Sequence, residues 1–464
     1  MPRACPCNDF SRTELMRAAA ARAGEGLPEI EYGMPTPAGT GLSRRTFLAR
    51  SVGLGLAVYG GSRLSSALLD DGIAQAAALG GPNDPVLLSV FLEGGADTLN
   101  VLFPAGDPQY QVLRPRLALP ASSGLKFAED ARLLWHPSAA GIATLHDEGK
   151  VTVMPAIGYD HPDKSHFTSR HFWEVGATDA HVLTGWLGRF LDVSGNAGNP
   201  LQGLSLDTRL QPALASAKVP IASLDSPDRY GFSDKRYGAV FPLENEMLDG
   251  VAQLGSTHAR SSDVALRQAG QAAQQAQTLR GKLSQFGTGE FGTKVQYPQS
   301  NDDFPHRLAG LAAMIQAGLP LRTVAIRAPG MYDTHNDQAD ALSAGLKLTG
   351  DSLLAFQRDL EARGIADRVL IHVWSEFGRR AKENGSLGTD HGAAGIGFLI
   401  GSRVRGGMIG EFPGLAGGLD SEGNLKPTAD FRSVYSAMIE QWFDVDAARI
   451  IPGASSFARP QLLR

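Results

Sequence analysis

The chain has 464 residues, of which 43% are hydrophobic and 20% charged, and its formal net charge is −5. This length and apolar content suffice for one large α/β domain or two ordinary ones. The slightly acidic balance and the lack of an arginine-rich stripe argue against nucleic acid as a partner.

The first segment carries the features of an export signal. Arg44 and Arg45 open the stretch SRRTFLARSVGLGLAVYGG, in which a paired-arginine head precedes a short, Gly-rich apolar run. A small-x-small pattern follows at residues 74–76. These features predict that residues 1–76 are an n-region and twin-arginine signal peptide, with the twin-arginine translocase as a partner during export. The alternative is a chance Arg-Arg pair on an anchoring helix, but spanning a bilayer takes roughly 20 apolar residues.

The mature chain is expected to begin at Ala77 and to reside in the periplasm, at the cell wall or outside the cell. Cys5 and Cys7, the two cysteines, both lie in the leader. We therefore expect neither disulfides nor thiolate chemistry in the mature protein. No other stretch is long and apolar enough to predict a membrane span in residues 77–464.

Apolar runs typical of buried parallel strands recur along the mature chain, with helical stretches between them. Helices are expected at 306–319 and 351–365, the second with Asp351 as its N-cap and its end near Gly364. The alternation predicts a doubly wound, mostly parallel α/β sheet with helices on both faces, in a single domain over 77–464. The strands are expected at 85–92, 150–157, 321–328, 368–375 and 395–401.

One region breaks this alternation. Residues 261–292 are polar and rich in Ala and Gln. They predict a solvent-facing helix inside a longer helical insertion near 200–300. Such an insertion could either cap an active site or form a surface excursion.

Acids and histidines recur just after the predicted strands, where open α/β sheets bind their ligands. The loop after strand 150–157 supplies His161, Asp163, Ser165 and His166. Mixed oxygen and nitrogen donors suit zinc, manganese or iron better than calcium or magnesium. We therefore predict a divalent metal site at this rim. Its expected ligands are Asp97, Asp333, His335, Glu376, Asp390 and His391.

Three further residues are candidates for catalysis. Ser165 stands where a helix could begin, so it is either a helix cap or a nucleophile activated by a nearby metal. Arg170 and Arg379 could contact a small anionic ester substrate bidentately, or they could be merely solvated. His372 lies within an apolar run and is interpreted as a core histidine.

Six motifs follow one another along the mature chain. They are VFLEGGADTLNVLFP, KSHFTSRHFWE, TGWLGRFLD, MYDTHNDQ, SEFGRRAKENGSLGTDHG and GGMIGEFPGL. In these motifs the chain resembles the bacterial domain-of-unknown-function 1501 family, whose members look like the alkaline phosphatase and sulfatase superfamily. The resemblance covers nearly all of the mature chain. It implies an alkaline phosphatase-like fold and a metal-assisted hydrolase of phosphate or sulfate esters.

The resemblance also implies roles for individual residues. Asp97 matches the first metal-binding Asp, and Ser165 stands roughly where the superfamily keeps its nucleophile. Asp333 and His335 resemble an Asp…His metal pair, although the superfamily's usual spacing is wider. His391 resembles a late His-Gly ligand.

Glu376 marks a departure, because it falls where relatives usually carry an Asp-His pair. The loss of that imidazole could convert a two-metal site into a one-metal site. This departure supports one alternative, a non-catalytic exported binding or assembly protein on a degenerate fold. Another alternative is a serine esterase that uses Ser165 with His166 or His391, although no G-x-S-x-G elbow is present.

Overall fold

The computed structural model describes residues 56–57 and 84–464, except 197–198, 208 and 229–240. The predicted twin-arginine leader, residues 1–76, lies outside the described residues apart from Leu56–Ala57, which forms strand β1. Within the described part of the chain, no helix combines the length and apolarity needed to cross a bilayer.

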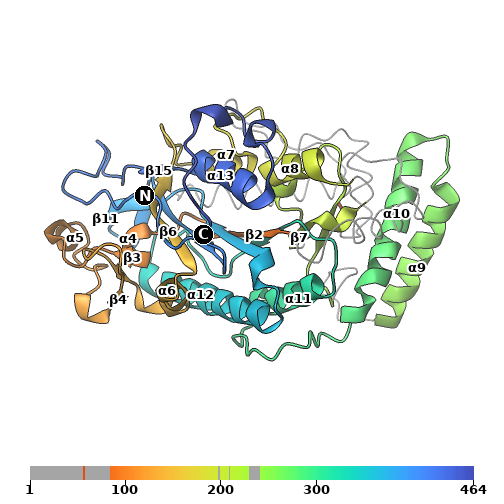
Figure 1. The fold of residues 1–464 in the computed structure, drawn as a ribbon, viewed down its shortest axis with the longest axis horizontal. Helices are drawn as coiled ribbons and strands as arrows, with labels where there is room; N and C mark the ends of the chain where they lie inside the picture. The colour runs from red at the N-terminus through yellow and green to blue at the C-terminus, as the bar shows by residue number, and fades with distance from the viewer. Residues whose placement is uncertain (1–55, 58–83, 197–198, 208, 229–240) are drawn as a thin grey trace, which may run out of the picture.

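A ten-stranded sheet forms the centre of the molecule (Figure 1). In order across it lie β1, β8 (Ile221–Leu224), β7 (Gly203–Leu206), β9 (Thr323–Arg327), β2 (Val86–Phe91), β10 (Val369–Trp374), β13 (Gly395–Ile400), β6 (Val151–Gly158) and β14 (Gly407–Met408), while β15 (Ala429–Asp430) also pairs with β6. The block from β8 to β10 is parallel, whereas β13 is antiparallel to both of its neighbours. The predicted doubly wound, mostly parallel α/β fold is therefore confirmed.

Helices cover both faces of this sheet (Figure 1). One face carries α6 (Ala140–Asp147), α11 (Phe304–Gln316) and α12 (Gln338–Ala362), and the other carries α7 (His166–Val175), α8 (Trp186–Ser194) and α13 (Phe431–Phe443). The side chains of β2 alternate between the two cores. Val86, Leu88 and Val90 pack in the α11–α12 core, whereas Leu87 and Phe91 pack in the α7–α13 core. A strand buried on both faces explains the continuous apolar runs of the sequence.

The five predicted strands coincide with β2, β6, β9, β10 and β13 to within two residues. The predicted start of α12 is wrong, because Asp351 lies inside the helix and pairs with Lys347 at 2.7 Å. The helix begins at Gln338 because its buried apolar stripe continues back through Leu346 and Leu342.

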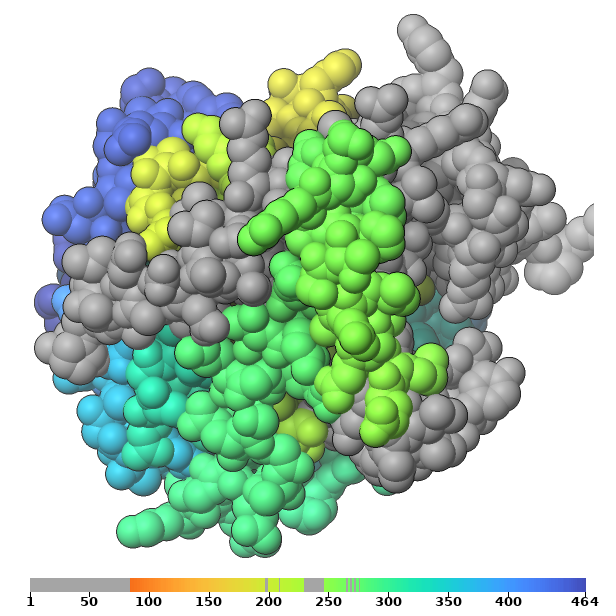
Figure 2. Space-filling model, turned by 90° about the vertical axis from the view of Figure 1, so that its right-hand side faces the viewer, coloured from red at the N-terminus to blue at the C-terminus, as the bar shows by residue number. Residues whose placement is uncertain are grey.

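The stretch 200–300, expected to be a helical insertion, first contributes β7 and β8 to the main sheet. Only afterwards come α9 (Phe241–His258) and α10 (Val264–Leu283), which pack against each other. This hairpin lies at the opposite end of the molecule from β11 (Arg379–Glu383), and Figure 2 shows it at the surface. The hairpin therefore lies away from the segments that carry the predicted metal site.

Two small sheets flank the main one. In the first, β11 pairs with β12 (Thr389–His391), which places His391 opposite Arg379. In the second, β3 (Leu102–Phe103), β5 (Leu134–Trp135) and β4 (Leu125–Lys126) pair in that order beside the short helices α4 (Thr98–Val101) and α5 (Pro108–Leu113).

Candidate metal centre

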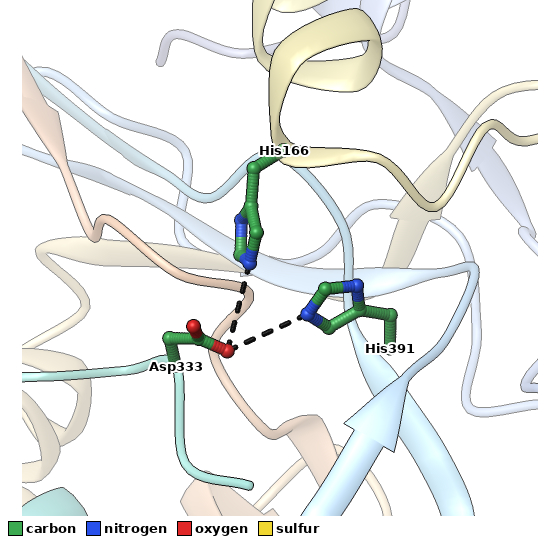
Figure 3. Close-up of side chains that lie close together, drawn as sticks. All are labelled: His166, Asp333 and His391. Carbon is green, nitrogen blue, oxygen red and sulfur yellow. Dashed lines mark hydrogen bonds and ion pairs between the residues drawn. The ribbon is translucent and has the colours of Figure 1, made fainter. Parts of the chain in front are cut away.

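Side chains from three segments converge at the carboxyl edge of the main sheet, where ligands bind in open α/β folds. His166 is the first residue of α7, Asp333 comes from the loop after β9, and His391 ends β12. Figure 3 shows both imidazole rings directed at one oxygen of Asp333. Within the described residues these three form the group of side chains able to hold a metal ion, with ligand atoms within 4.8 Å of one another.

Asp333 Oδ1 is the common point of this group. It lies 3.5 Å from His166 Nε2 and 3.4 Å from His391 Nε2. His335 joins from the same loop as Asp333, with its Nε2 3.2 Å from Asp333 Oδ1 and 2.9 Å from His391 Nε2. Three imidazole nitrogens thus surround one carboxylate oxygen.

The opposite nitrogen of each ring meets an oxygen acceptor. His166 Nδ1 lies 2.7 Å from Glu376 Oε1, His391 Nδ1 lies 2.8 Å from the Lys164 carbonyl, and His335 Nδ1 lies 3.3 Å from Asp390 Oδ1. A carbonyl or carboxylate oxygen only accepts, so each Nδ1 carries its hydrogen and donates. In the neutral rings, all three Nε2 atoms therefore turn a lone pair toward Asp333.

Lone pairs that face one another at such distances require a positive charge between them, either a proton or a metal ion. Ligand atoms bound tetrahedrally at about 2.1 Å from a metal lie about 3.4 Å apart. The three nitrogens lie 3.2–3.5 Å from Asp333 Oδ1, near that spacing, whereas the 2.9 Å between His335 Nε2 and His391 Nε2 is shorter. Imidazoles oriented by acceptors on their far nitrogen are typical of metal sites.

The electrostatics of the cluster favour bound positive charge. Burial alone would raise the pKa of Asp333, but its hydrogen-bond contacts with the three imidazoles and the charge of Arg379 hold it well below its usual range. Burial alone would lower the pKa of His166, but hydrogen bonds to Asp333 and Glu376 raise it to about 9. Burial and the nearby positive groups lower the pKa of His391, which favours the neutral ring and leaves its Nε2 lone pair available to a metal ion.

Arg379 stands behind Asp333 and was expected to contact substrate. Its fully buried guanidinium donates to Asp333 Oδ1 at 2.6 Å, to the carbonyls of Gly95 and Thr389 at 2.9 and 2.8 Å, and to the carbonyl of Tyr332 at 3.1 Å. All three guanidinium nitrogens donate to protein oxygens, so the group faces inward. In this structure Arg379 holds Asp333 in place.

Glu376 was expected to bind metal directly, but its buried carboxylate is used by protein donors. It accepts from the amides of Gly94 and Gly95 at 3.0 and 3.2 Å, from Ser375 Oγ at 3.1 Å, and from His166 Nδ1. Gly94 has φ +120°, and a Cβ there would meet the Asp333 backbone, so glycine permits this approach. Glu376 therefore orients His166.

Asp97, also expected to bind metal, lies outside the cluster. Its buried carboxylate accepts both Arg114 guanidinium nitrogens at 2.6 and 2.9 Å and Gln338 Nε2 at 2.5 Å. It also caps α4 through the amide of Leu99. The oxygens of Asp97 therefore face Arg114, Gln338 and the Leu99 amide, and not the cluster.

The remaining candidates lie around the cluster. Ser165 caps α7, because its Oγ accepts the Phe167 amide at 3.2 Å. Arg170 pairs with Glu93 at 2.7 Å and Glu174 at 2.8 Å and so does not face the cluster as an unpaired cation. Asp390 is 52% exposed and touches the cluster only through His335.

His372 has the location expected of a core histidine. It is fully buried in β10 and packs edge-on against Tyr435, and burial lowers its pKa to about 3. The cluster residue that sequence reasoning omitted from the expected metal ligands is His166. Its position directly after a capping Ser165, at the carboxyl end of β6, is the signal that could have identified it.

A family model described as a protein of unknown function (DUF1501) matches residues 211–452, more than half of the chain. The match confirms the resemblance drawn from the motifs. A search of curated proteins found no match.

Three solved structures share a low likeness with the chain. The first is Ps i-CgsB in complex with k-i-k-neocarrahexaose, at 10% identity and TM-score 0.36, covering 80% of this chain and 74% of the other. The second is the lipoteichoic acid synthase LtaP from Listeria monocytogenes, at 7% identity and TM-score 0.33, covering 86% of this chain and 80% of the other. The third is the PsFucS1 sulfatase from Pseudoalteromonas sp., at 11% identity and TM-score 0.33, covering 86% of this chain and 76% of the other.

Proposed function

Since the chain belongs to a family of proteins of unknown function (DUF1501), we propose from the geometry of its site that it is an exported, metal-dependent hydrolase of phosphate or sulfate esters. One observation carries the proposal: the Nε2 atoms of His166 and His391 converge on Asp333, while the Nδ1 atom of each ring is held by a protein oxygen. The leader motif supports export by the twin-arginine route to the periplasm, cell wall or medium.

His166, His391 and Asp333 would hold the ion, with His335 as a further donor. This mixture of imidazole and carboxylate ligands favours zinc, manganese or iron. A divalent cation at such a site supplies a Lewis acid for an ester oxygen and activates a nucleophile. The buried ring of Phe377 packs against two of these imidazoles, with its centroid 4.8 Å from that of His166 and 4.7 Å from that of His391.

Water is the nucleophile that this arrangement favours. Ser165 uses its Oγ to cap α7, so its replacement by Ala should cost roughly 1 kcal/mol of stability and leave turnover in place. Loss of turnover in a folded Ser165→Ala protein that retains metal would instead make Ser165 the nucleophile. Both nitrogens of His166 and of His391 are directed at other groups, which disfavours the serine esterase alternative.

The test compares bound metal and hydrolysis in the wild type, His391→Ala and the control His181→Ala, whose side chain is 95% exposed. Elemental mass spectrometry on protein purified without chelator should find near-stoichiometric metal in the wild type and control and little in His391→Ala. Hydrolysis of p-nitrophenyl phosphate or sulfate should follow the metal. A well-folded wild type without metal would overturn the proposal.

A second candidate function is a non-catalytic metal-binding or assembly protein. The commitment of Arg170 and Arg379 to protein carboxylates and carbonyls favours it, because neither is left to neutralise an anionic substrate. Bound metal without hydrolysis across a panel of phosphate, sulfate and carboxylate esters would support this candidate over the hydrolase.

A further inference from the structure

One buried amide lies beneath the segments that carry the cluster. Gln338, the first residue of α12, is completely buried. Its Nε2 donates to Asp97 Oδ2 at 2.5 Å. Its Oε1 accepts from Thr334 Oγ1 at 2.9 Å and from Thr389 Oγ1 at 2.6 Å.

The direction of each of these bonds follows from the chemistry of Asp97. Its carboxylate can only accept, so the NH₂ group of Gln338 must face it and the amide oxygen must face the two threonines. Both hydroxyls therefore donate to one oxygen. Arg114 fixes Asp97 with a bidentate pair, and its Nε also donates to the carbonyl of Ala381 in β11 at 2.9 Å.

The two threonines are neighbours of the cluster residues in sequence. Thr334 lies between Asp333 and His335, and Thr389 lies two residues before His391. The backbone joins the same segments, because the Thr389 amide donates to the Thr334 carbonyl at 3.0 Å. A single side chain thus bonds to two of the three segments that form the cluster, and it is in turn anchored by a buried ion pair.

We propose that Asp97, Arg114, Thr334, Gln338 and Thr389, the Gln338 network, are positioning residues that set the separation of Asp333 and His335 from His391 and thereby the metal affinity. The inference rests on the metal site proposed above. It gives Asp97 a role in metal binding that acts through Gln338 and not through coordination. Changes in such outer groups typically weaken metal binding 10- to 100-fold.

The test measures dissociation constants for Zn²⁺ by competition with a chromophoric chelator, together with the visible absorption spectrum of the Co²⁺-loaded full chain. Gln338→Met keeps the length of the side chain and removes both kinds of bond. We expect its Zn²⁺ dissociation constant to rise by about 10- to 100-fold and its Co²⁺ spectrum to change. Thr389→Val removes one hydroxyl and should weaken binding several-fold, which keeps the test usable if Gln338→Met folds poorly.

A double-mutant cycle separates positioning from general destabilisation. If Thr389 acts through Gln338, adding Thr389→Val to Gln338→Met should change the dissociation constant little further. Ser205→Ala is the matched control, because the buried Ser205 hydroxyl in β7 donates to the Arg209 carbonyl at 2.7 Å and accepts the Gln211 amide at 3.0 Å, both outside the Gln338 network. It should lower the unfolding temperature without changing Zn²⁺ affinity.

The outcomes distinguish this inference from the function on which it rests. A wild type that binds neither Zn²⁺ nor Co²⁺ would overturn both the metal site and the network's role. A wild type that binds, together with folded Gln338→Met and Thr389→Val proteins of unchanged affinity and spectrum, would overturn the network's role alone.

Discussion

Replacing Glu376 by Gln tests whether the orientation of His166 depends on a carboxylate. One oxygen of Glu376 faces His166 Nδ1 at 2.7 Å, and the other faces the Gly95 amide at 3.2 Å and Ser375 Oγ at 3.1 Å. The ring nitrogen and the Gly95 amide donate, while the single Ser375 hydroxyl hydrogen is shared between Glu376 and the Leu92 carbonyl, which lies 2.7 Å from Oγ. A glutamine amide offers one accepting oxygen and one donating nitrogen, so in either orientation a donor meets a donor.

The two orientations have different consequences. If the amide oxygen faces His166, the Gly95 amide loses a charge-assisted hydrogen bond, which costs about 1.5–3 kcal/mol of unfolding free energy. If the amide nitrogen faces His166, the ring must move its hydrogen to Nε2, which removes the lone pair directed at Asp333. We therefore expect reduced stability in both orientations. The metal affinity should fall by up to about 10- to 100-fold, depending on how much of the protein adopts the second orientation.

The assay combines Zn²⁺ competition titrations with thermal unfolding of the metal-free protein. Glu383→Gln is the matched control, because Glu383 also accepts two backbone amides, those of Arg116 and Leu117, and one side chain, yet it touches no cluster residue. It should lose stability and keep its Zn²⁺ affinity. Unchanged Zn²⁺ affinity in a folded Glu376→Gln protein, with stability reduced as in the control, would refute the orienting role.

Three further predictions concern stability. Zn²⁺ at 100 times its dissociation constant should raise the free energy of unfolding by about 2.7 kcal/mol in denaturant titrations, and His391→Ala should show no such rise. Because the pKa of buried His372 falls to about 3, the unfolded chain binds more protons than the folded chain below pH 6.5. The stability that neutral His372 contributes is therefore fully present above pH 6.5 and is lost as the pH falls toward 3. His372→Leu should reduce the pH dependence of the unfolding free energy in this range by up to about 1.4 kcal/mol per pH unit. The same pH dependence in the wild type and in His372→Leu, measured by denaturant unfolding, would contradict this prediction. Gly378→Ala should lower the unfolding temperature, because the new Cβ would collide with the Ala394 carbonyl oxygen, and an unchanged value would show that the backbone shifts.

The main strands could be predicted because burial on both faces leaves a continuous apolar signal. β2 and β10 are six-residue strands in which every position is buried. β7 and β8 have only four residues each, and a run that short resembles any apolar segment of a loop. Asp351 illustrates a different limit, since an acidic residue inside a helix carries the same local pattern as an N-cap.

The rim residues could be predicted for a topological reason, because parallel strands end at one edge and the residues that follow them must meet there. This rule placed Asp333, His335 and His391 together. It does not indicate which carboxylate faces the centre. Arg114 pairs with Asp97 from 17 positions away, and the amide of Gly94 meets Glu376 from 282 positions away. Such partners depend on tertiary contacts that leave no local pattern in a single sequence.

The hydrogen bonds of Glu376 also limit the number of metal ions that the site can hold. The Glu376 carboxylate is surrounded by the amides of Gly94 and Gly95, Ser375 and the ring of His166. A second ion would have to displace hydrogen bonds that are buried and charge-assisted, each worth about 1.5–3 kcal/mol. The same bonds fix the tautomer that points His166 at Asp333. We therefore expect one metal ion per chain, and an elemental analysis that finds two would mean that Glu376 gives up these partners when the site is loaded.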